Sequence, residues 1–134
     1  METTGLHHFN ITAPVELLEP VRDFYVDVLG LSVGERPGFT RMGFWLYSRG
    51  EPIVHLTACA DGDARANGKS GPNFFDHIAF ACQGLAGFIA RLKQLNVAYE
   101  VIEIASLGQT QVFVRDPAGV GVELNFFNEA DAAA

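Results

Sequence analysis

The pattern of apolar and polar positions runs through the same order twice along this chain. Strict alternation over short runs indicates strands, and apolar positions three and four apart indicate helices. The first half predicts a strand over 6–12, a helix over 18–29, and strands over 31–35, 39–48 and 52–59. The second half predicts a strand over 74–82, a helix over 85–95, and strands over 98–103, 109–115 and 120–127. Each half therefore reads as a βαβββ module, and the chain as an α+β fold with pseudo-two-fold symmetry.

Proline and glycine set the expected ends of the first helix. Pro20 is tolerated only in the first turn, where its missing N–H is not needed, so we expect the helix to start near Leu18. Gly30 is a suitable stop after the last apolar position, and Asn96 takes the equivalent place in the second half.

Residues 60–73 divide the two modules. The segment is rich in glycine, aspartate and asparagine and offers almost nothing to bury, so it predicts a loop. We expect a single domain over 1–134, with module 1 over about 5–59, a linker over 60–73, module 2 over about 74–127 and a frayed tail over 128–134.

Composition excludes several classes of function. A net charge of −7 argues against nucleic-acid binding, which needs a basic face, and no apolar run is long enough to span a membrane. The first residues carry no secretion signal, so we expect a cytoplasmic protein. Cys59 and Cys82 lie in no CxxC motif and are expected to be free thiols.

Superposing the halves brings four metal-ligand residues to equivalent places. His8 falls on His77 and His55 falls on Glu123, because the step from His8 to His55 is 47 residues and the step from His77 to Glu123 is 46. Strand alternation directs each of these side chains to one face. Three imidazoles and a carboxylate suit a divalent ion such as zinc, iron, manganese, nickel or cobalt. The alternative makes the histidines ordinary core or surface residues, although a buried Glu123 without a partner would be costly.

Neighbouring side chains supply candidates for substrate binding. His7 has the opposite parity from His8 and is expected to be no ligand, but a register slip of one residue would exchange their roles. Aromatic and polar residues alternate along 39–48 and 109–115, and a mixed wall of that kind suits a small substrate. The residues predicted to contact substrate are Asn10, Arg41, Trp45 and Phe113. In the alternative, Trp45 and Phe113 belong to the core, Arg41 lies on the surface, and the opposite strand face lines the site.

Several segments, in this order, resemble the vicinal-oxygen-chelate superfamily, which includes glyoxalases, bleomycin-resistance proteins and extradiol dioxygenases. They are Leu6-His7-His8-Phe9-Asn10-Ile11, Phe24-Tyr25-Val26-Asp27-Val28-Leu29-Gly30-Leu31, Asp76-His77-Ile78-Ala79-Phe80, Phe113-Val114-Arg115-Asp116-Pro117-Ala118-Gly119 and Val122-Glu123-Leu124. The resemblance implies two βαβββ modules that form an open, curled mixed β-barrel with helices outside, and a metal at His8, His55, His77 and Glu123. Glyoxalase I types usually carry a carboxylate, and epimerase types an amide, where this chain has His55.

The resemblance leaves three functions open. A lyase or isomerase would bind vicinal oxygens of a small substrate on the metal, with Glu123 as the base. An iron(II) ring-cleaving dioxygenase would use His8, His77 and Glu123, although His55 would then occupy a position that the reaction needs. A bleomycin-resistance-like protein would bind a drug or metabolite without catalysis. Relatives of this kind commonly pair and open sheet edges favour covering, so we expect a homodimer.

Overall fold

The computed structural model describes residues 1–67 and 74–129 of this 134-residue chain. The chain divides into two compact units, unit 1 over Met1–Pro72 and unit 2 over Asn73–Ala134. Each unit is described by itself below. Among the described residues, neither helix combines the length and apolar character required to cross a bilayer.

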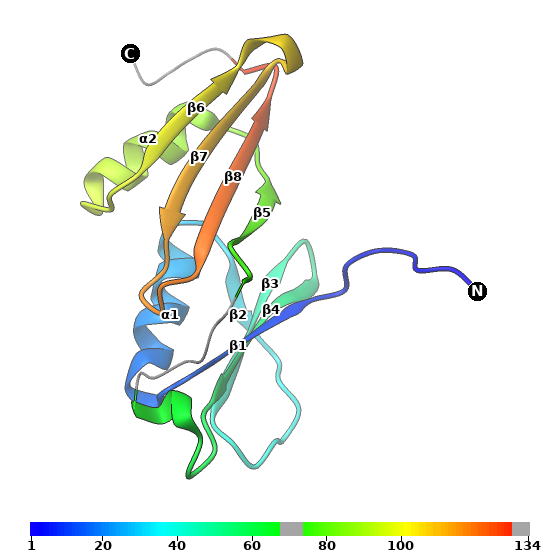
Figure 1. The fold of residues 1–134 in the computed structure, drawn as a ribbon, viewed down its shortest axis with the longest axis vertical. Helices are drawn as coiled ribbons and strands as arrows, with labels where there is room; N and C mark the ends of the chain where they lie inside the picture. The colour runs from blue at the N-terminus through cyan, green and yellow to red at the C-terminus, as the bar shows by residue number, and fades with distance from the viewer. Residues whose placement is uncertain (68–73, 130–134) are drawn as a thin grey trace. The chain divides into compact units, whose positions relative to one another are not determined.

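Unit 1 is a four-stranded mixed sheet covered by one helix (Figure 1). Its elements are β1 (Phe9–Ala13), α1 (Val15–Asp27), β2 (Ser32–Gly34), β3 (Gly43–Ser48), β4 (Glu51–Ala58) and the short 3-10 helix η1 (Ala64–Asn67). The strand order is β1-β4-β3-β2, with β1 parallel to β4 and the other pairs antiparallel.

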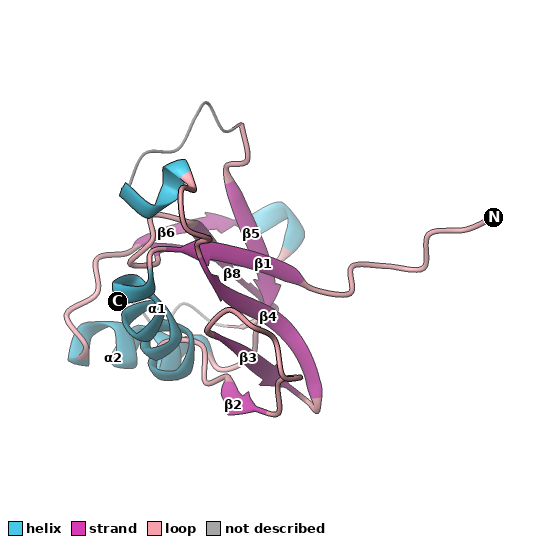
Figure 2. Ribbon diagram, turned by 90° about the horizontal axis from the view of Figure 1, so that it is seen from below, coloured by secondary structure: helices cyan, strands magenta, loops and turns pink. Residues whose placement is uncertain are grey.

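Unit 2 repeats this topology, and Figure 2 shows the helices and strands of both units in a second view. Its elements are β5 (His77–Ala81), α2 (Leu85–Gln94), β6 (Glu100–Ile104), the 3-10 turn η2 (Ala105–Leu107), β7 (Gln109–Arg115) and β8 (Gly121–Phe127). The strand order is β5-β8-β7-β6, with only β5 and β8 parallel. The predicted α+β fold of two βαβββ modules is confirmed, and each curled sheet is open, with two free edges.

The core of each unit lies between its helix and one face of its sheet. In unit 1, Leu18, Val21 and Tyr25 of α1 are fully buried, as are Leu46 of β3 and Val54 of β4. In unit 2 the fully buried side chains include Leu92 of α2, Val112 of β7, and Val122, Leu124 and Phe126 of β8. Alternation on the strands therefore sends the intervening residues to the opposite face of each sheet.

The start of the first helix was predicted less well than its stop signal. α1 begins at Val15, three residues before the expected Leu18, so Pro20 lies inside the helix. Pro20 has no N–H to donate to the carbonyl one turn earlier, a loss that packing of the helix against β3 and β4 must offset. Gly30 ends the helix as predicted, with φ 73° and its N–H donating to Val26 O, and Asn96 has φ 55° after α2.

The strand predicted over 39–48 was too long. β3 begins only at Gly43, because residues 36–42 form a folded loop instead. Phe39 N–H donates to Pro37 O over 2.8 Å, which closes a tight turn. The strand predicted over 74–82 likewise starts only at His77, and Phe74 before it is 98% exposed.

The segments expected to be loop and tail have local structure where they are described. Residues 64–67 of the linker form η1, while 68–73 lie outside the described residues. At the other end, Glu129 accepts hydrogen bonds from the N–H groups of Gly84 and Leu85, at the start of α2. The predicted fraying from residue 128 is therefore wrong for Asn128 and Glu129, and 130–134 lie outside the described residues.

Candidate functional site

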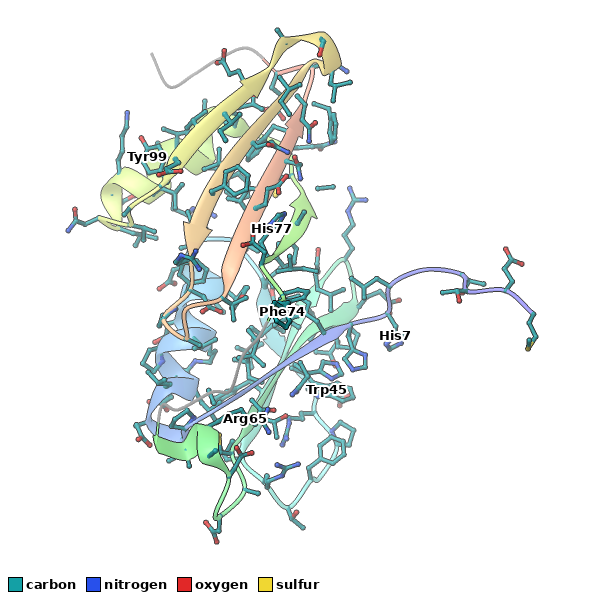
Figure 3. All side chains as sticks on the ribbon, in the orientation of Figure 1. His7, Trp45, Arg65, Phe74, His77 and Tyr99 are labelled. Atoms are coloured by element: carbon teal, nitrogen blue, oxygen red, sulfur yellow. The ribbon has the colours of Figure 1, made fainter. Side chains whose placement is uncertain are left out.

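One face of the unit 1 sheet gathers polar and aromatic side chains. His55 on β4 pairs with Asn10 on β1 and with Trp45 on β3, so all three lie on the face opposite the core. Asn10 is already hydrogen-bonded, since its Nδ2 donates to Thr12 and its Oδ1 accepts from Thr57. Trp45 is labelled in Figure 3 and marks this face.

Three rings form a stack on this face. The His8 and His55 ring centroids are 3.9 Å apart with the planes at 16°, and Trp45 stacks on the other side of His55 at 4.2 Å and 11°. His8 precedes β1 and is exposed, and its Nδ1 lies 2.8 Å from His7 Nδ1. Ring nitrogens of stacked imidazoles lie in parallel planes, so His8 must rotate before both rings can reach one ion.

The surroundings of His55 favour its neutral form. The ring is buried, and this desolvation lowers its pKa below the ordinary 6.5, with His8 lowering it further. His55 Nε2 lies 3.0 Å from Pro52 O, and a carbonyl can only accept, so Nε2 carries the proton. The lone pair of the neutral ring is therefore on Nδ1, ready for an electrophile.

In unit 2, His77 and Glu123 occupy the positions equivalent to His8 and His55. Glu123 on β8 is only 5% exposed, and its Oε2 lies 2.8 Å from His77 Nε2. Its other oxygen, Oε1, accepts a 2.7 Å hydrogen bond from Gln111 Nε2. Asp76 Oδ2 lies 2.7 Å from His77 Nδ1, so the imidazole stands between two carboxylates. Figure 3 labels His77 at the start of β5.

These contacts shift the pKa values of His77 and Asp76 in opposite directions. The hydrogen bond that His77 donates to Asp76 raises the pKa of His77, and the charge of Glu123 raises it further. The same hydrogen bond lowers the pKa of Asp76, which accepts it. A proton on His77 and the charges of the two carboxylates therefore stabilise one another.

The strand registers show that the two pairs occupy equivalent positions. The residue on β1 that pairs with His55 is Asn10, two residues after His8. The residue on β5 that pairs with Glu123 is Ala79, two residues after His77. The sequence superposition of the halves therefore corresponds to the same hydrogen-bonding register in each unit.

His8, His55, His77 and Glu123 offer the nitrogen and oxygen donors that divalent ions prefer, and the two pairs belong to different units. Among the described residues, no three histidine, cysteine or acidic side chains gather as a metal-binding group. A nitrogen and an oxygen that bind one ion at about 2.0–2.2 Å, with a right angle between the two bonds, lie about 2.9 Å apart. The 2.8 Å between His77 Nε2 and Glu123 Oε2 is close to this spacing, so a cation could replace the shared proton with little side-chain movement.

Each unit has a cavity beside its pair. The unit 1 cavity has a volume of about 250 Å³ and is lined by Arg36, Phe39, Thr40, Arg41, Trp45, His55 and Thr57. In unit 2, a cavity of about 550 Å³ contains His77, Phe113 and Arg115, and the Phe113 ring lies edge-on to His77 at 5.9 Å. Trp45, Arg41 and Phe113 thus line cavities. Sequence reasoning missed Arg36; Pro37-Gly38, a turn-forming pair, was the available signal for a loop there.

Comparison with known proteins identifies the class of protein. The model of the Glyoxalase/Bleomycin resistance protein/Dioxygenase superfamily matches residues 5–124, and the chain belongs to this superfamily. No curated protein sequence matches this chain.

Solved structures agree with the fold. A glyoxalase family protein from Bacillus anthracis superposes with a TM-score of 0.70 at 20% identity, covering 93% of this chain and 96% of that one. Lactoylglutathione lyase from Agrobacterium tumefaciens gives 0.64 at 19% identity, with 93% and 95% covered. A mutant of the fosfomycin resistance protein FosX from Listeria monocytogenes, complexed with Mn(II) and 1S,2S-dihydroxypropylphosphonic acid, gives 0.70 at 13% identity, with 94% of each chain covered.

Proposed function

We propose that this protein is a metal-dependent enzyme of the lyase or isomerase type, which binds a small substrate through two neighbouring oxygens. The observation that carries the proposal is the buried Glu123 carboxylate, held by Gln111 on one oxygen and by His77 on the other. Buried carboxylate–imidazole pairs of this kind are common at functional sites, where a divalent ion or a transferred proton can take the place of the proton that the pair shares. The named relatives support the proposal, since one is a lyase and another was crystallised with Mn(II).

The proposed metal ligands are His8, His55, His77 and Glu123. Two of them come from each unit, His8 and His55 from unit 1 and His77 and Glu123 from unit 2. When bound, the divalent ion would act as a Lewis acid that polarises the substrate oxygens and stabilises the negative charge that develops on them. The neutral ring of His55 and the carboxylate of Glu123 are suited to this role, because ligands must be deprotonated.

Glu123 is the proposed base. Gln111 holds the carboxylate through Oε1, and Oε2, which faces His77 in the metal-free protein, would be the atom that accepts a proton from the carbon beside the substrate oxygens. The same atom would return the proton to the neighbouring carbon in an isomerisation. Trp45 and Phe113 are proposed to contact the apolar part of the substrate, and Arg41 and Asn10 its polar part.

Metal binding tests the ligand set directly. Purified protein is stripped with chelator and titrated with Mn²⁺, Zn²⁺ or Co²⁺ in a calorimeter. We expect His8→Gln and His77→Gln each to weaken binding at least tenfold, whereas His7→Gln, a matched change beside His8, leaves it unchanged. Equal affinity of wild type and His77→Gln for every metal would refute the proposed centre.

Proton exchange tests the role of Glu123. Metal-loaded protein is incubated with hydroxyacetone in D₂O, and deuterium incorporation is followed by NMR. Glu123→Gln should keep its far-UV circular dichroism and lose at least 100-fold in exchange rate, a typical contribution of a general base. Glu103→Gln, an exposed change on β6 of the same sheet, is the control. Exchange at the wild-type rate in Glu123→Gln would remove this residue from the chemistry. Oxygen uptake on a catechol by iron-loaded protein would instead favour a dioxygenase.

A further inference from the structure

The loop between β2 and β3 holds an arginine side chain in a fixed place. Arg36 Nη1 donates to Arg41 O over 3.1 Å, and the guanidinium carbon lies 4.9 Å from the centroid of the Phe39 ring. Gly43 leaves room for this group, because a Cβ there would lie 2.7 Å from Arg36 Nη2. The guanidinium is therefore positioned by a hydrogen bond, an aromatic face and the absence of a side chain at residue 43.

This positioned group has an unused donor. Arg36 Nε is buried and has no hydrogen-bond partner among the described residues. Buried N–H groups are nearly always paired, so an unpaired one in a native fold calls for an explanation. A carboxylate bound beside the guanidinium would give this charged group an acceptor that the protein itself does not provide.

The cavity beside Arg36 is positively charged in an acidic protein. The chain has a net charge of −7, yet the residues that line the 250 Å³ cavity include two arginines and no carboxylate. Among the described residues, neither Arg36 nor Arg41 belongs to an ion pair. Asp63, whose charge interacts with that of Arg41, is itself paired with Arg65 at 2.7 Å. The net field in the cavity favours an anion.

We propose that this cavity binds the carboxylate of a small aromatic or conjugated acid, with Arg36 as the residue that recognises it. A guanidinium presents its donors as a planar fork that matches a carboxylate. The flat Trp45 and Phe39 rings line the same cavity and suit a planar apolar group next to that carboxylate. The 250 Å³ volume lies just below the usual range for ligand pockets, which limits the ligand to one of about the size of a single ring.

The position of the cavity suggests what this ligand is. His55 forms part of its wall, and the charge of Arg36 acts on that ring. The anionic end of a substrate bound by Arg36 would therefore lie beside one of the proposed metal ligands. The statement that this acid is the substrate rests on the proposed function, whereas binding of the carboxylate does not require a metal.

Intrinsic fluorescence offers a direct test, because Trp45 is the one tryptophan of the sequence and lines the cavity. Metal-free protein in chelator is titrated with benzoate and, separately, with benzamide, a neutral molecule of nearly the same shape. We expect saturable quenching by benzoate and at least tenfold weaker binding of benzamide. Equal affinity for the two probes, or no saturable response to benzoate, would overturn the proposal.

Arginine variants locate the recognition. Arg36→Gln should weaken benzoate binding at least tenfold, and Arg36→Lys, which keeps the charge but lacks the fork, at least threefold. Arg49→Gln, an exposed change of the same kind on the β3–β4 turn, is the matched control and should bind like wild type. If Arg36→Gln loses the near-UV dichroism of the folded loop, Arg36→Lys decides the matter. If Arg36→Lys and Arg41→Gln both bind benzoate with wild-type affinity, the assignment of carboxylate recognition to this cavity is overturned. Displacement of benzoate by an equal concentration of inorganic phosphate would overturn it as well.

The two proposals fail in different ways. Loss of benzoate binding with metal affinity intact would remove only the carboxylate site. Benzoate binding that persists in a protein with no affinity for any metal would instead remove the proposed enzyme and leave a carboxylate-binding protein.

Discussion

The hydrogen bond between Gln111 and Glu123 allows a quantitative prediction, because a matched pair lies two residues away on the same strand. Gln111 Nε2 donates to the buried carboxylate of Glu123 over 2.7 Å, whereas Gln109 Nε2 donates to the neutral amide of Asn125. Both glutamines lie on β7 and have similar, intermediate exposure. The two acceptors differ chiefly in charge.

Replacing Gln111 by Leu keeps the size of the side chain and removes the donor. A hydrogen bond to a charged group contributes about 1.5–3 kcal/mol, and one between neutral groups about 0.5–1.5 kcal/mol. We therefore expect Gln111→Leu to lower the free energy of unfolding of metal-free protein by about 2 kcal/mol, and Gln109→Leu by about 1 kcal/mol. At an m value of about 2 kcal/mol/M, these losses move the urea midpoint by about 1 M and 0.5 M.

The measurement is urea unfolding in chelator, followed by far-UV circular dichroism, with m compared between variants. An unchanged m shows that the loss belongs to the folded state. A loss for Gln111→Leu no greater than that for Gln109→Leu would refute this prediction, because the charge of Glu123 would then not strengthen its hydrogen bond to Gln111.

Three further predictions follow from burial and ionisation. In NMR titrations of metal-free protein, the imidazole of His55 should change its charge below pH 6.5 and that of His77 above it, and the reverse order would contradict the contacts described. Accordingly, the stability that His77 contributes is fully present below pH 6.5 and is lost as pH rises through its raised pKa, whereas that of the neutral His55 is lost as pH falls below 6.5. Burial raises the pKa of Cys82 to about 11, so about 0.1% of this thiol is thiolate at pH 8. Alkylation of Cys82, followed by mass spectrometry, should therefore accelerate about tenfold per pH unit. Rapid modification at pH 8 would be inconsistent with a buried thiol. Leu46→Ala, at a fully buried position, should lower the free energy of unfolding in urea by about 2–5 kcal/mol, and Val33→Ala, at an exposed position, by under about 1 kcal/mol. Similar losses in the two variants would show that burial does not set the cost.

The topology could be predicted because each helix and strand buries one face, which gives a clear pattern of apolar positions, and the same order of patterns occurs twice. β7 was predicted to the residue, and its buried residues alternate without a break. The errors fell where local interactions override the pattern. Residues 39–42 continue the alternation of β3, but Pro37 and the anchored guanidinium of Arg36 turn the chain away from the sheet. Periodicity carries no information about such contacts, which depend on where one particular side chain ends.

The candidate site was predictable in its residues and not in their arrangement. Equivalent spacing in the two halves was enough to place His55 and Glu123 at matching registers. It could not show that Gln111 holds Glu123, or that Asp76 holds His77, because these contacts depend on side-chain rotamers. Nor could it show that His55 would be sandwiched between two rings.

Unit 1 carries His55 where unit 2 carries Glu123, and this difference has a chemical consequence. If both positions carried glutamate, two carboxylates would neutralise a divalent ion, and an anionic substrate would gain little there. With His55 in unit 1, the proposed set of three neutral imidazoles and one carboxylate leaves a divalent centre with a net charge of about +1. A glutamate at position 55 would also add a carboxylate to the wall of the cavity that Arg36 lines, where it would compete with an anionic ligand for the guanidinium. A single exchange of acid for imidazole therefore favours an anionic ligand twice, once at the proposed metal and once at the guanidinium, which is why the carboxylate site and the unusual histidine are best understood together.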